Sequence, residues 1–156
     1  MESPRKQQTS EGSSPPPPTF VLETALYAED LDAAQDFYGG LIGLELQSRV
    51  GDRHVFFRIG EAMLLVFNPT RTEIASGGSL SAPPHGARGA GHVCFAADTA
   101  ALDQWCERFE AAGVSVEADF QWPNGARSIY VRDPAMNSVE FAEPHLWTAP
   151  AKPARP

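Results

Sequence analysis

Apolar and polar residues alternate with the two-residue period of a β-strand through much of the chain between residues 19 and 147. The alternation predicts strands, which we place at 19–27, 44–50, 54–59, 63–67, 91–97, 114–120, 127–132 and 137–142. Two segments instead carry apolar residues at helical spacing and begin with an aspartate that can cap the first turn. We expect helices at about 30–41 and 100–112, ended by Gly43 and Gly113.

The predicted order of elements, strand–helix–strand–strand–strand, occurs twice along the chain. Glu23 in the first copy corresponds to His92 in the second, and Leu65 corresponds to Glu140. We therefore predict an α+β fold, in which two βαβββ modules form a curved mixed sheet with the helices on its outer face.

The domain limits follow from composition. A single domain is expected at 19–147, with module one at about 19–69 and module two at about 90–147. Residues at about 70–89 are rich in Gly, Pro and Ser and are predicted to be a linker. The end segments 1–18 and 148–156 contain few apolar residues, so we expect both to be disordered tails.

Each predicted strand separates by parity into two faces. One face is apolar and is expected to pack beneath the helices; it comprises Leu22, Thr24, Leu26, Val55, Phe57, Ile59, Val93, Phe95, Ile129, Val131, Val139 and Phe141. The other face mixes large apolar side chains with Arg, His and Glu. That mixture is typical of a pocket, in which a few polar groups converge on an apolar lining.

The segment 132–141 predicts the end of one strand, a tight turn and a short final strand. Asp133 followed by Pro134 opens the turn, and Asn137 is the residue that we expect to take the left-handed conformation. Alternation along the final strand then puts Glu140 on the mixed face.

Three possible metal ligands share the mixed face, namely Glu23, His92 and Glu140. A pseudo-twofold relation between the modules would bring Glu23 close to His92, and two carboxylates with one imidazole suit a divalent metal. Simpler interpretations are that His92 bonds to a neighbouring strand and that Glu23 forms an ion pair. Glu140 would then pair with Arg58 or Arg132.

Other side chains on the mixed face are candidate substrate contacts: His54, Phe56, Arg58, Phe67, Tyr130 and Arg132. The two arginines could clamp an anionic or carbonyl-bearing substrate, or they could serve as counter-charges. The aromatic residues could line a cavity or pack between the modules. Trp122 and Trp147 could form a pocket lid or a dimer contact.

The formal net charge of −8 argues against nucleic-acid binding and against adhesion to anionic membranes. No apolar run is long enough to span a bilayer, and the N-terminus lacks the apolar core of a signal peptide. Cys94 and Cys106 do not amount to a disulfide framework, which favours a reduced, cytoplasmic protein.

At these positions the chain resembles the glyoxalase/bleomycin-resistance/extradiol-dioxygenase superfamily, whose members are also called vicinal oxygen chelate proteins. The resemblance is carried by segments 22–31, 37–44, 91–95 and 133–140, and it covers about residues 20–147. The order and spacing of these segments are together specific for the fold.

The resemblance implies metal ligands on the first and the last strand of each module. Those positions fall on Glu23, Leu65, His92 and Glu140, and a leucine cannot bind a metal, so three ligands remain. A divalent transition metal (Mn, Fe, Co, Ni or Zn) and a homodimer are also implied. Glu140 or Glu23 would be the catalytic general base.

Two classes of function stay open. One is a metal-dependent enzyme that binds a small molecule through two adjacent oxygens, acting as an isomerase, lyase, dioxygenase or transferase. The other is a metal-free protein of the bleomycin-resistance type that sequesters a small molecule such as an antibiotic. Leu65 at a ligand position favours sequestration, whereas His92 and Glu140 together favour the enzyme.

Overall fold

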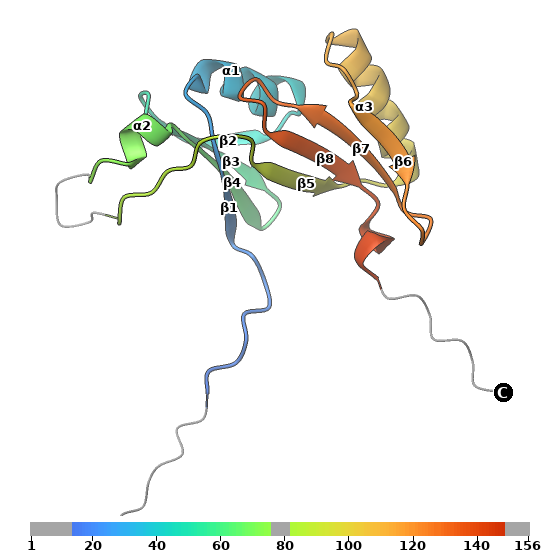
Figure 1. Cartoon of the computed structure of the whole chain (residues 1–156), viewed down its shortest axis with the longest axis horizontal. Helices are drawn as coiled ribbons and strands as arrows, with labels where there is room; N and C mark the ends of the chain where they lie inside the picture. The colour runs from blue at the N-terminus through green and yellow to red at the C-terminus, as the bar shows by residue number, and fades with distance from the viewer. Residues whose placement is uncertain (1–13, 76–81, 149–156) are drawn as a thin grey trace, which may run out of the picture.

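The computed structural model describes residues 14–75 and 82–148 and places their strands in two four-stranded mixed sheets (Figure 1). The first sheet has the order β1-β4-β3-β2, with strands β1 (Glu23–Tyr27), β2 (Glu45–Val50), β3 (His54–Ile59) and β4 (Ala62–Phe67). The second has the order β5-β8-β7-β6, with strands β5 (His92–Ala96), β6 (Ala118–Gln121), β7 (Arg127–Arg132) and β8 (Ser138–Ala142). In both sheets the first strand runs parallel to the last. The predicted α+β fold with two βαβββ modules is confirmed, with the strands divided between two sheets.

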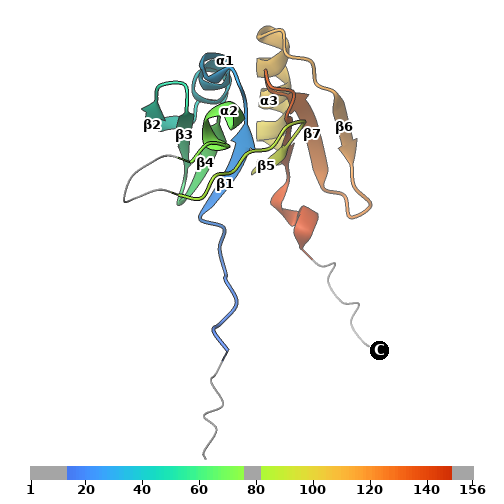
Figure 2. The same cartoon turned by 60° about the vertical axis from the view of Figure 1, so that its left-hand side comes forward.

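The predicted helices are present, and both lie on the same side of the sheets (Figure 2). The first is α1 (Leu31–Gln35), which continues as the π-helix η1 (Asp36–Leu41), and the second is α3 (Thr99–Ala111). The expected caps form, because Asp30 Oδ1 accepts from the Ala33 N–H at 2.9 Å and Asp98 Oδ1 from the Ala101 N–H at 2.8 Å. Gly113 follows α3 with φ of +70°, a left-handed conformation that glycine adopts without strain.

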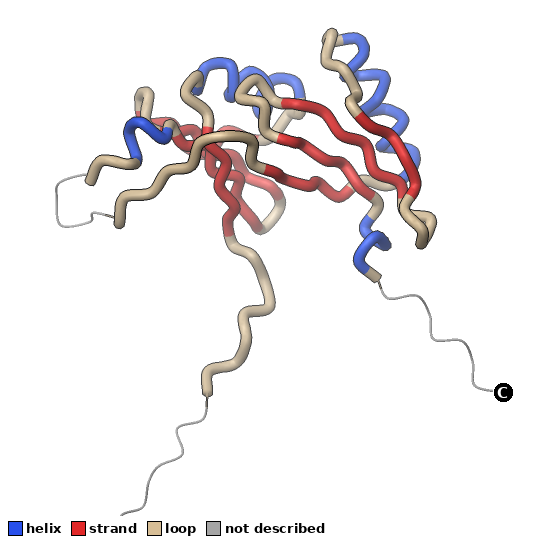
Figure 3. Tube along the Cα trace, in the orientation of Figure 1, coloured by secondary structure: helices blue, strands red, loops and turns tan. Residues whose placement is uncertain are grey.

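Three shorter segments differ from the prediction (Figure 3). The helix α2 (Pro69–Thr72) lies where the linker was expected to begin, because Asn68 caps it and Pro69 occupies its first position. The strand predicted at 114–120 is confined to β6, and a 3₁₀ helix, η2 (Pro144–Trp147), follows β8. Residues 14–22 form neither helix nor strand. The rest of the predicted tails (1–13 and 149–156) and residues 76–81 of the linker lie outside the described residues.

One hydrophobic core joins the apolar face of both sheets to the helices. The strands contribute Leu26, Val55, Phe57, Val93, Ile129, Val131, Val139 and Phe141, and the helices contribute Tyr38, Leu102 and Phe109. Full burial of one such side chain stabilises the fold by about 1.5–3 kcal/mol. The predicted inner face is therefore confirmed except at Leu22. This residue is 66% exposed, because β1 begins only at the next residue, Glu23.

A buried hydrogen-bond network joins the modules at the turn between β7 and β8. The Tyr38 hydroxyl of module one donates to Asp133 Oδ2 of module two at 2.8 Å. Asn137 Nδ2 donates to the same oxygen at 2.8 Å and to the Tyr27 carbonyl at 3.2 Å. The left-handed residue of this turn is Met136, with φ of 66°, and not Asn137 as expected. The side-chain amide of Asn137 bonds to residues of both modules. Its exposed neighbour, Met136, therefore takes the strained left-handed conformation.

None of the helices within residues 14–75 and 82–148 combines the length and the apolar character that crossing a bilayer requires.

Candidate functional site

His92 and Glu140 converge on the face of the second sheet that points away from the core. Their strands, β5 and β8, are parallel neighbours in which His92 pairs with Ser138 and Cys94 pairs with Glu140. Both side chains therefore project from the same face. His92 Nε2 lies 3.2 Å from Glu140 Oε2. The residue Glu140 is only 5% exposed, whereas the side chain of His92 is 52% exposed.

The other ring nitrogen of His92, Nδ1, fixes the orientation of the imidazole. Nδ1 lies 3.1 Å from the Ser138 carbonyl oxygen, and a carbonyl can only accept, so Nδ1 carries the proton. In the neutral ring Nε2 then presents a lone pair toward the Glu140 carboxylate. Two acceptors at this distance repel each other unless a proton or a cation lies between them. A backbone carbonyl that orients an imidazole in this way is a common support of metal-binding histidines.

The other oxygen of the Glu140 carboxylate, Oε1, is buried and has no hydrogen-bond partner in the described structure. Tyr130 and Cys94 flank the carboxylate from the neighbouring strands. Burial first, and then the charge and hydrogen bonding of Glu140, raise the pKa of the Cys94 thiol to about 12. Burial, followed by hydrogen bonding to Glu140 and its charge, raises the pKa of Tyr130 to about 12. Both groups are therefore neutral near pH 7.

Glu23 lies apart from this pair. It begins β1 of the first sheet, where it pairs with Met63 and is exposed to solvent. Among the described residues no group of three or more His, Cys, Asp or Glu side chains is placed to hold a metal ion. The structure thus brings together two of the three predicted ligands within one chain.

The strand register supports the predicted correspondence between Leu65 and Glu140. Leu65 lies opposite Ala25 and Phe56 in the first sheet, as Glu140 lies opposite Cys94 and Tyr130 in the second. Leu65 is 7% exposed and packs as an apolar residue. The two modules therefore share a backbone but differ in chemistry at this position.

Of the predicted substrate contacts, only Tyr130 lines the cavity next to His92 and Glu140. His54, Phe56 and Phe67 form an aromatic cluster on the first sheet, where the rings of His54 and Phe56 stack with centroids 3.9 Å apart. This cluster extends to His85, whose Nδ1 is hydrogen-bonded to the Tyr27 hydroxyl at 2.9 Å.

The two arginines predicted to bind substrate are engaged elsewhere. Arg58 is exposed and binds Gln47 Oε1 through Nε and Nη2. Arg132 binds Glu117 and lines a different hollow, together with Met136. Neither side chain lines the cavity that contains His92.

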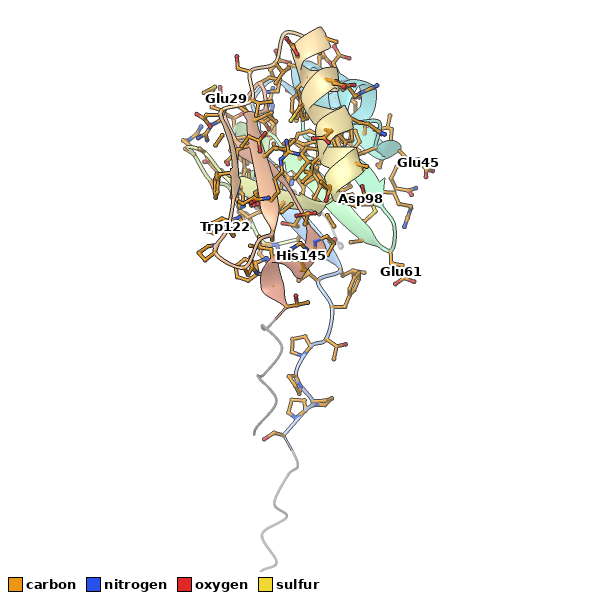
Figure 4. All side chains as sticks on the ribbon, turned by 90° about the vertical axis from the view of Figure 1, so that its right-hand side faces the viewer. Glu29, Glu45, Glu61, Asp98, Trp122 and His145 are labelled. Carbon is orange, nitrogen blue, oxygen red and sulfur yellow. The ribbon has the colours of Figure 1, made fainter. Side chains whose placement is uncertain are left out.

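That cavity has a volume of about 470 Å³ and is lined by His92, Trp122, Pro123, Asn124, Tyr130, Glu140, Leu146 and Trp147. Trp122 and Trp147, named from the sequence as lid or dimer residues, thus belong to its wall. Figure 4 labels Trp122 and also His145, the neighbour of Leu146 in η2. Asn124 and Leu146 were missed, because a turn and a segment after the last strand carry no periodic signal. A turn that contains Trp122 and Pro123 was the one available hint.

The geometry favours chemistry on oxygen-bearing small molecules. The unpaired Oε1 of Glu140 can take up a proton, and the pair formed by His92 Nε2 and Glu140 Oε2 can accept a cation. The donor set of one imidazole and one carboxylate fits a divalent transition metal, although further ligands are needed.

Comparison with known families places most of the chain in one group. The profile of the Glyoxalase/Bleomycin resistance protein/Dioxygenase superfamily matches residues 21–141. No curated protein sequence matches the chain significantly.

Solved structures include a protein of high similarity. Lactoylglutathione lyase from Agrobacterium tumefaciens is 48% identical with a TM-score of 0.80, and the match covers 86% of this chain and 100% of that protein. A glyoxalase/bleomycin resistance protein/dioxygenase from Nocardioides is 22% identical, with a TM-score of 0.67 and coverage of 92% and 93%. An integron cassette protein from the mobile metagenome of a Halifax Harbour sewage outfall is 19% identical, with a TM-score of 0.62 and coverage of 80% and 97%. The last two show similarity of fold alone.

Proposed function

Because the chain belongs to the Glyoxalase/Bleomycin resistance protein/Dioxygenase superfamily, we propose that it is a metal-dependent enzyme that binds its substrate through two adjacent oxygens. His92 and Glu140 are the proposed ligands from one chain. The observation that carries the proposal is the convergence of His92 Nε2 on Glu140 Oε2, with Glu140 Oε1 buried and unpaired. Such a pair is electrostatically unfavourable without a cation or a shared proton.

Glu23 is the proposed third ligand, and it comes from a second copy of the chain. This proposal is supported by the exposure of Glu23, whose carboxylate makes no hydrogen bond or ion pair with any described residue, and by the half-exposed side chain of His92. The repeat gives both modules the same topology, so a homodimer can place Glu23 of the partner subunit next to His92. Cytoplasmic location stays a prediction; both cysteines are free thiols.

The proposed reaction is the isomerisation of a thiol adduct of a 2-oxoaldehyde to a 2-hydroxyacyl thioester. The reverse reaction, followed by dissociation of the adduct into thiol and 2-oxoaldehyde, is formal lyase chemistry. The name of the Agrobacterium protein supports this choice, since lactoylglutathione is such a thioester and carries a hydroxyl next to its carbonyl. A divalent cation, when bound, would polarise the two adjacent oxygens and stabilise the negative charge that develops on them.

The described side chains supply the proton transfer. The Glu140 carboxylate takes the proton from the carbon that bears sulfur and hydroxyl, and the same proton then returns to the adjacent carbon. The hydroxyl proton passes to the second oxygen, so the sulfur-bearing carbon becomes the thioester carbonyl. Atoms and electrons balance without an external oxidant. Tyr130, neutral near pH 7 beside this carboxylate, can donate a hydrogen bond to a substrate oxygen.

A second candidate function is metal-free sequestration of a small molecule. Two observations favour it: Leu65 occupies the position that corresponds to Glu140, and the described residues of one chain hold no three-ligand cluster. In that case His92 and Glu140 would bind each other and would not serve as metal ligands.

Metal analysis of the untagged protein separates the two functions. We expect bound transition metal in the wild type, together with a rise in melting temperature when Mn, Fe, Co, Ni or Zn is added. His92→Ala and Glu140→Gln should each lower metal affinity at least ~10-fold. His54→Ala, a histidine variant on the other sheet, is the matched control and should bind metal as the wild type does. A wild type that neither contains metal nor gains stability from it would leave sequestration as the function.

A further inference from the structure

The cavity beside His92 and Glu140 is divided by polarity. His92, Glu140 and Tyr130 supply the reactive polar groups of the lining, and Trp122, Pro123, Asn124, Leu146 and Trp147 supply the rest. Its volume of about 470 Å³ falls within the range of small-molecule sites, which is about 300–1,000 Å³. A molecule that reaches the reactive end must therefore place its other end against apolar side chains.

The polar groups at the apolar end are already bound within the protein. The Trp122 indole N–H donates to Ser128 Oγ at 2.8 Å, so the ring presents only carbon to the cavity. Asn124 Nδ2 donates to the carbonyls of His145 and Leu146 at 3.2 and 3.1 Å. Its Oδ1 accepts from the Ala126 N–H. A charged or strongly polar ligand group would find these side-chain donors already engaged within the protein.

Within the described residues the cavity also lacks a cation. No Lys or Arg belongs to its lining. Every arginine in residues 14–75 and 82–148 is already bound elsewhere: Arg49 to Asp32, Arg53 to the Arg71 carbonyl, Arg58 to Gln47, Arg71 to Asp52, Arg88 to Glu29 and Glu73, Arg108 to the Leu41 carbonyl, Arg127 to Asp103 and Asp119, and Arg132 to Glu117. A carboxylate placed in the cavity away from His92 and Glu140 would find no Lys or Arg counter-charge among the described residues.

Aromatic rings form an ordered wall at this site. The rings of Phe120 and Tyr130 are parallel within 6°, with centroids 5.8 Å apart, and Phe120 meets Trp122 edge-on at 5.1 Å. His92 continues the stack beside Tyr130, at 6.4 Å and 22°. A flat ring adjacent to the reactive oxygens can pack against such a wall, and aromatic pairs are worth more than the area they bury.

We infer that the substrate group that occupies this cavity is an uncharged planar aromatic group, attached directly to the carbonyl carbon next to the carbon that bears sulfur and hydroxyl. The inference rests on the proposed function for the placement of those oxygens at His92 and Glu140. This inference excludes glutathione as the group that fills the cavity, because glutathione carries two carboxylates and an ammonium group at pH 7.

Three hydroxamates test the inference by calorimetry on the metal-loaded protein, since a hydroxamate presents two adjacent oxygens to a metal. Benzohydroxamate should bind at least ~10-fold more tightly than acetohydroxamate, because its ring buries apolar area. 4-Carboxybenzohydroxamate should bind at least ~10-fold more weakly than benzohydroxamate, because the aromatic lining offers its carboxylate no cationic partner. Equal or tighter binding of the carboxylated probe overturns the inference, provided that acetohydroxamate binds.

Variants assign the effect to the cavity wall. Trp122→Leu and Trp147→Ala should remove most of the preference for benzohydroxamate while leaving acetohydroxamate affinity within ~2-fold. Trp147 is exposed, so its variant preserves the fold even if Trp122→Leu does not. Phe20→Ala is the control, because Phe20 is an exposed aromatic residue outside this lining. Trp147→Lys should improve binding of the carboxylated probe relative to Trp147→Ala. If both Trp147 variants keep the full preference of the wild type, the inference is wrong.

One further measurement separates failure of the inference from failure of the proposed function. If acetohydroxamate does not bind the metal-supplemented protein, the proposed function fails, and acetophenone is then titrated against the metal-free protein by tryptophan fluorescence. Quenching by acetophenone that is absent with 4-acetylbenzoate and lost in Trp147→Ala upholds the aromatic site. Absence of quenching in the wild type overturns it.

Discussion

At the scale of single residues, Glu140 carries the energetic cost of a buried carboxylate, which the neutral Cys94 thiol and Tyr130 hydroxyl beside it offset only in part. Its carboxylate is 5% exposed, one oxygen has no hydrogen-bond partner, and the other faces a histidine nitrogen. A buried carboxylate in such surroundings destabilises a fold unless a cation or proton satisfies it. The cost is consistent with a residue retained for chemistry. At the corresponding position of the first sheet the buried residue is the apolar Leu65, so the fold itself does not require a carboxylate there.

The prediction at this scale concerns Glu140→Leu. In the metal-free protein the substitution should raise the free energy of unfolding by about 1–3 kcal/mol, because an apolar side chain replaces an unsatisfied carboxylate. The same variant should lose metal binding. Denaturant unfolding with EDTA present is the measurement, and Glu45→Leu on the exposed strand β2 is the control. A fall in stability would mean that Glu140 is satisfied by a partner in solution.

At the scale of elements, β3 and β4 carry a packed aromatic face that the sequence assigned to substrate binding. His54 stacks on Phe56 from the same strand, and Phe67 of β4 closes the cluster edge-on. Burial first, and then the nearby Arg53 guanidinium, lower the pKa of His54 below its ordinary value. Imidazole in this environment is therefore held neutral, and it acts as an aromatic ring in the sheet.

A pH dependence follows from that depressed pKa. Below a pH of about 6.5 the unfolded chain binds a proton at His54 that the folded chain resists. The contribution of His54 is therefore fully present above the unfolded pKa and is lost as the pH falls through the folded one. Between pH 7.5 and 5.5 the free energy of unfolding should fall more for the wild type than for His54→Phe.

Urea unfolding at several pH values measures this difference. His145→Gln, which removes an exposed histidine from η2, should keep the wild-type dependence. Parallel curves for the wild type and His54→Phe would show that His54 titrates alike in both states.

At the scale of the whole molecule, the two modules are held in one arrangement by a shared core and by the Tyr38–Asp133–Asn137 network. This arrangement puts the His92–Glu140 pair and Glu23 on separate sheets, each open to solvent. A metal site with all three ligands therefore requires a second copy, and the proposed homodimer supplies it.

Mixed dimers test that requirement. Glu23→Gln and His92→Ala subunits should each be defective alone, whereas a mixed dimer regains one intact site of two. Co-expressed and affinity-separated mixed dimers should recover about half of the wild-type metal content, if sites assemble between chains. The comparison is a mixed dimer of a wild-type subunit and a Glu23→Gln/His92→Ala double-variant subunit. In that dimer each site shared between chains contains one substituted residue, so no shared site is intact. Metal recovered in neither combination, or in the second alone, would contradict a shared site.

The sequence by itself determined the parts of this protein that repeat with a fixed period. Alternation located the strands and their inner face, aspartates located the starts of α1 and α3, and the duplication located the correspondence between Leu65 and Glu140. These features depend on neighbours along the chain, and a periodic pattern encodes them directly. The resemblance of segments 22–31, 37–44, 91–95 and 133–140 to the superfamily is also local in sequence, and the match over residues 21–141 confirms it.

Only the tertiary structure decided which polar groups meet. His92 and Glu140 belong to adjacent parallel strands, whereas Glu23 belongs to another sheet, and strand parity cannot distinguish these cases. The wall formed by Trp122, Leu146 and Trp147 comes from a turn and a short 3₁₀ segment that have no period to read. Contacts between segments far apart in sequence depend on how the core orients the sheets, and local pattern holds no record of that packing.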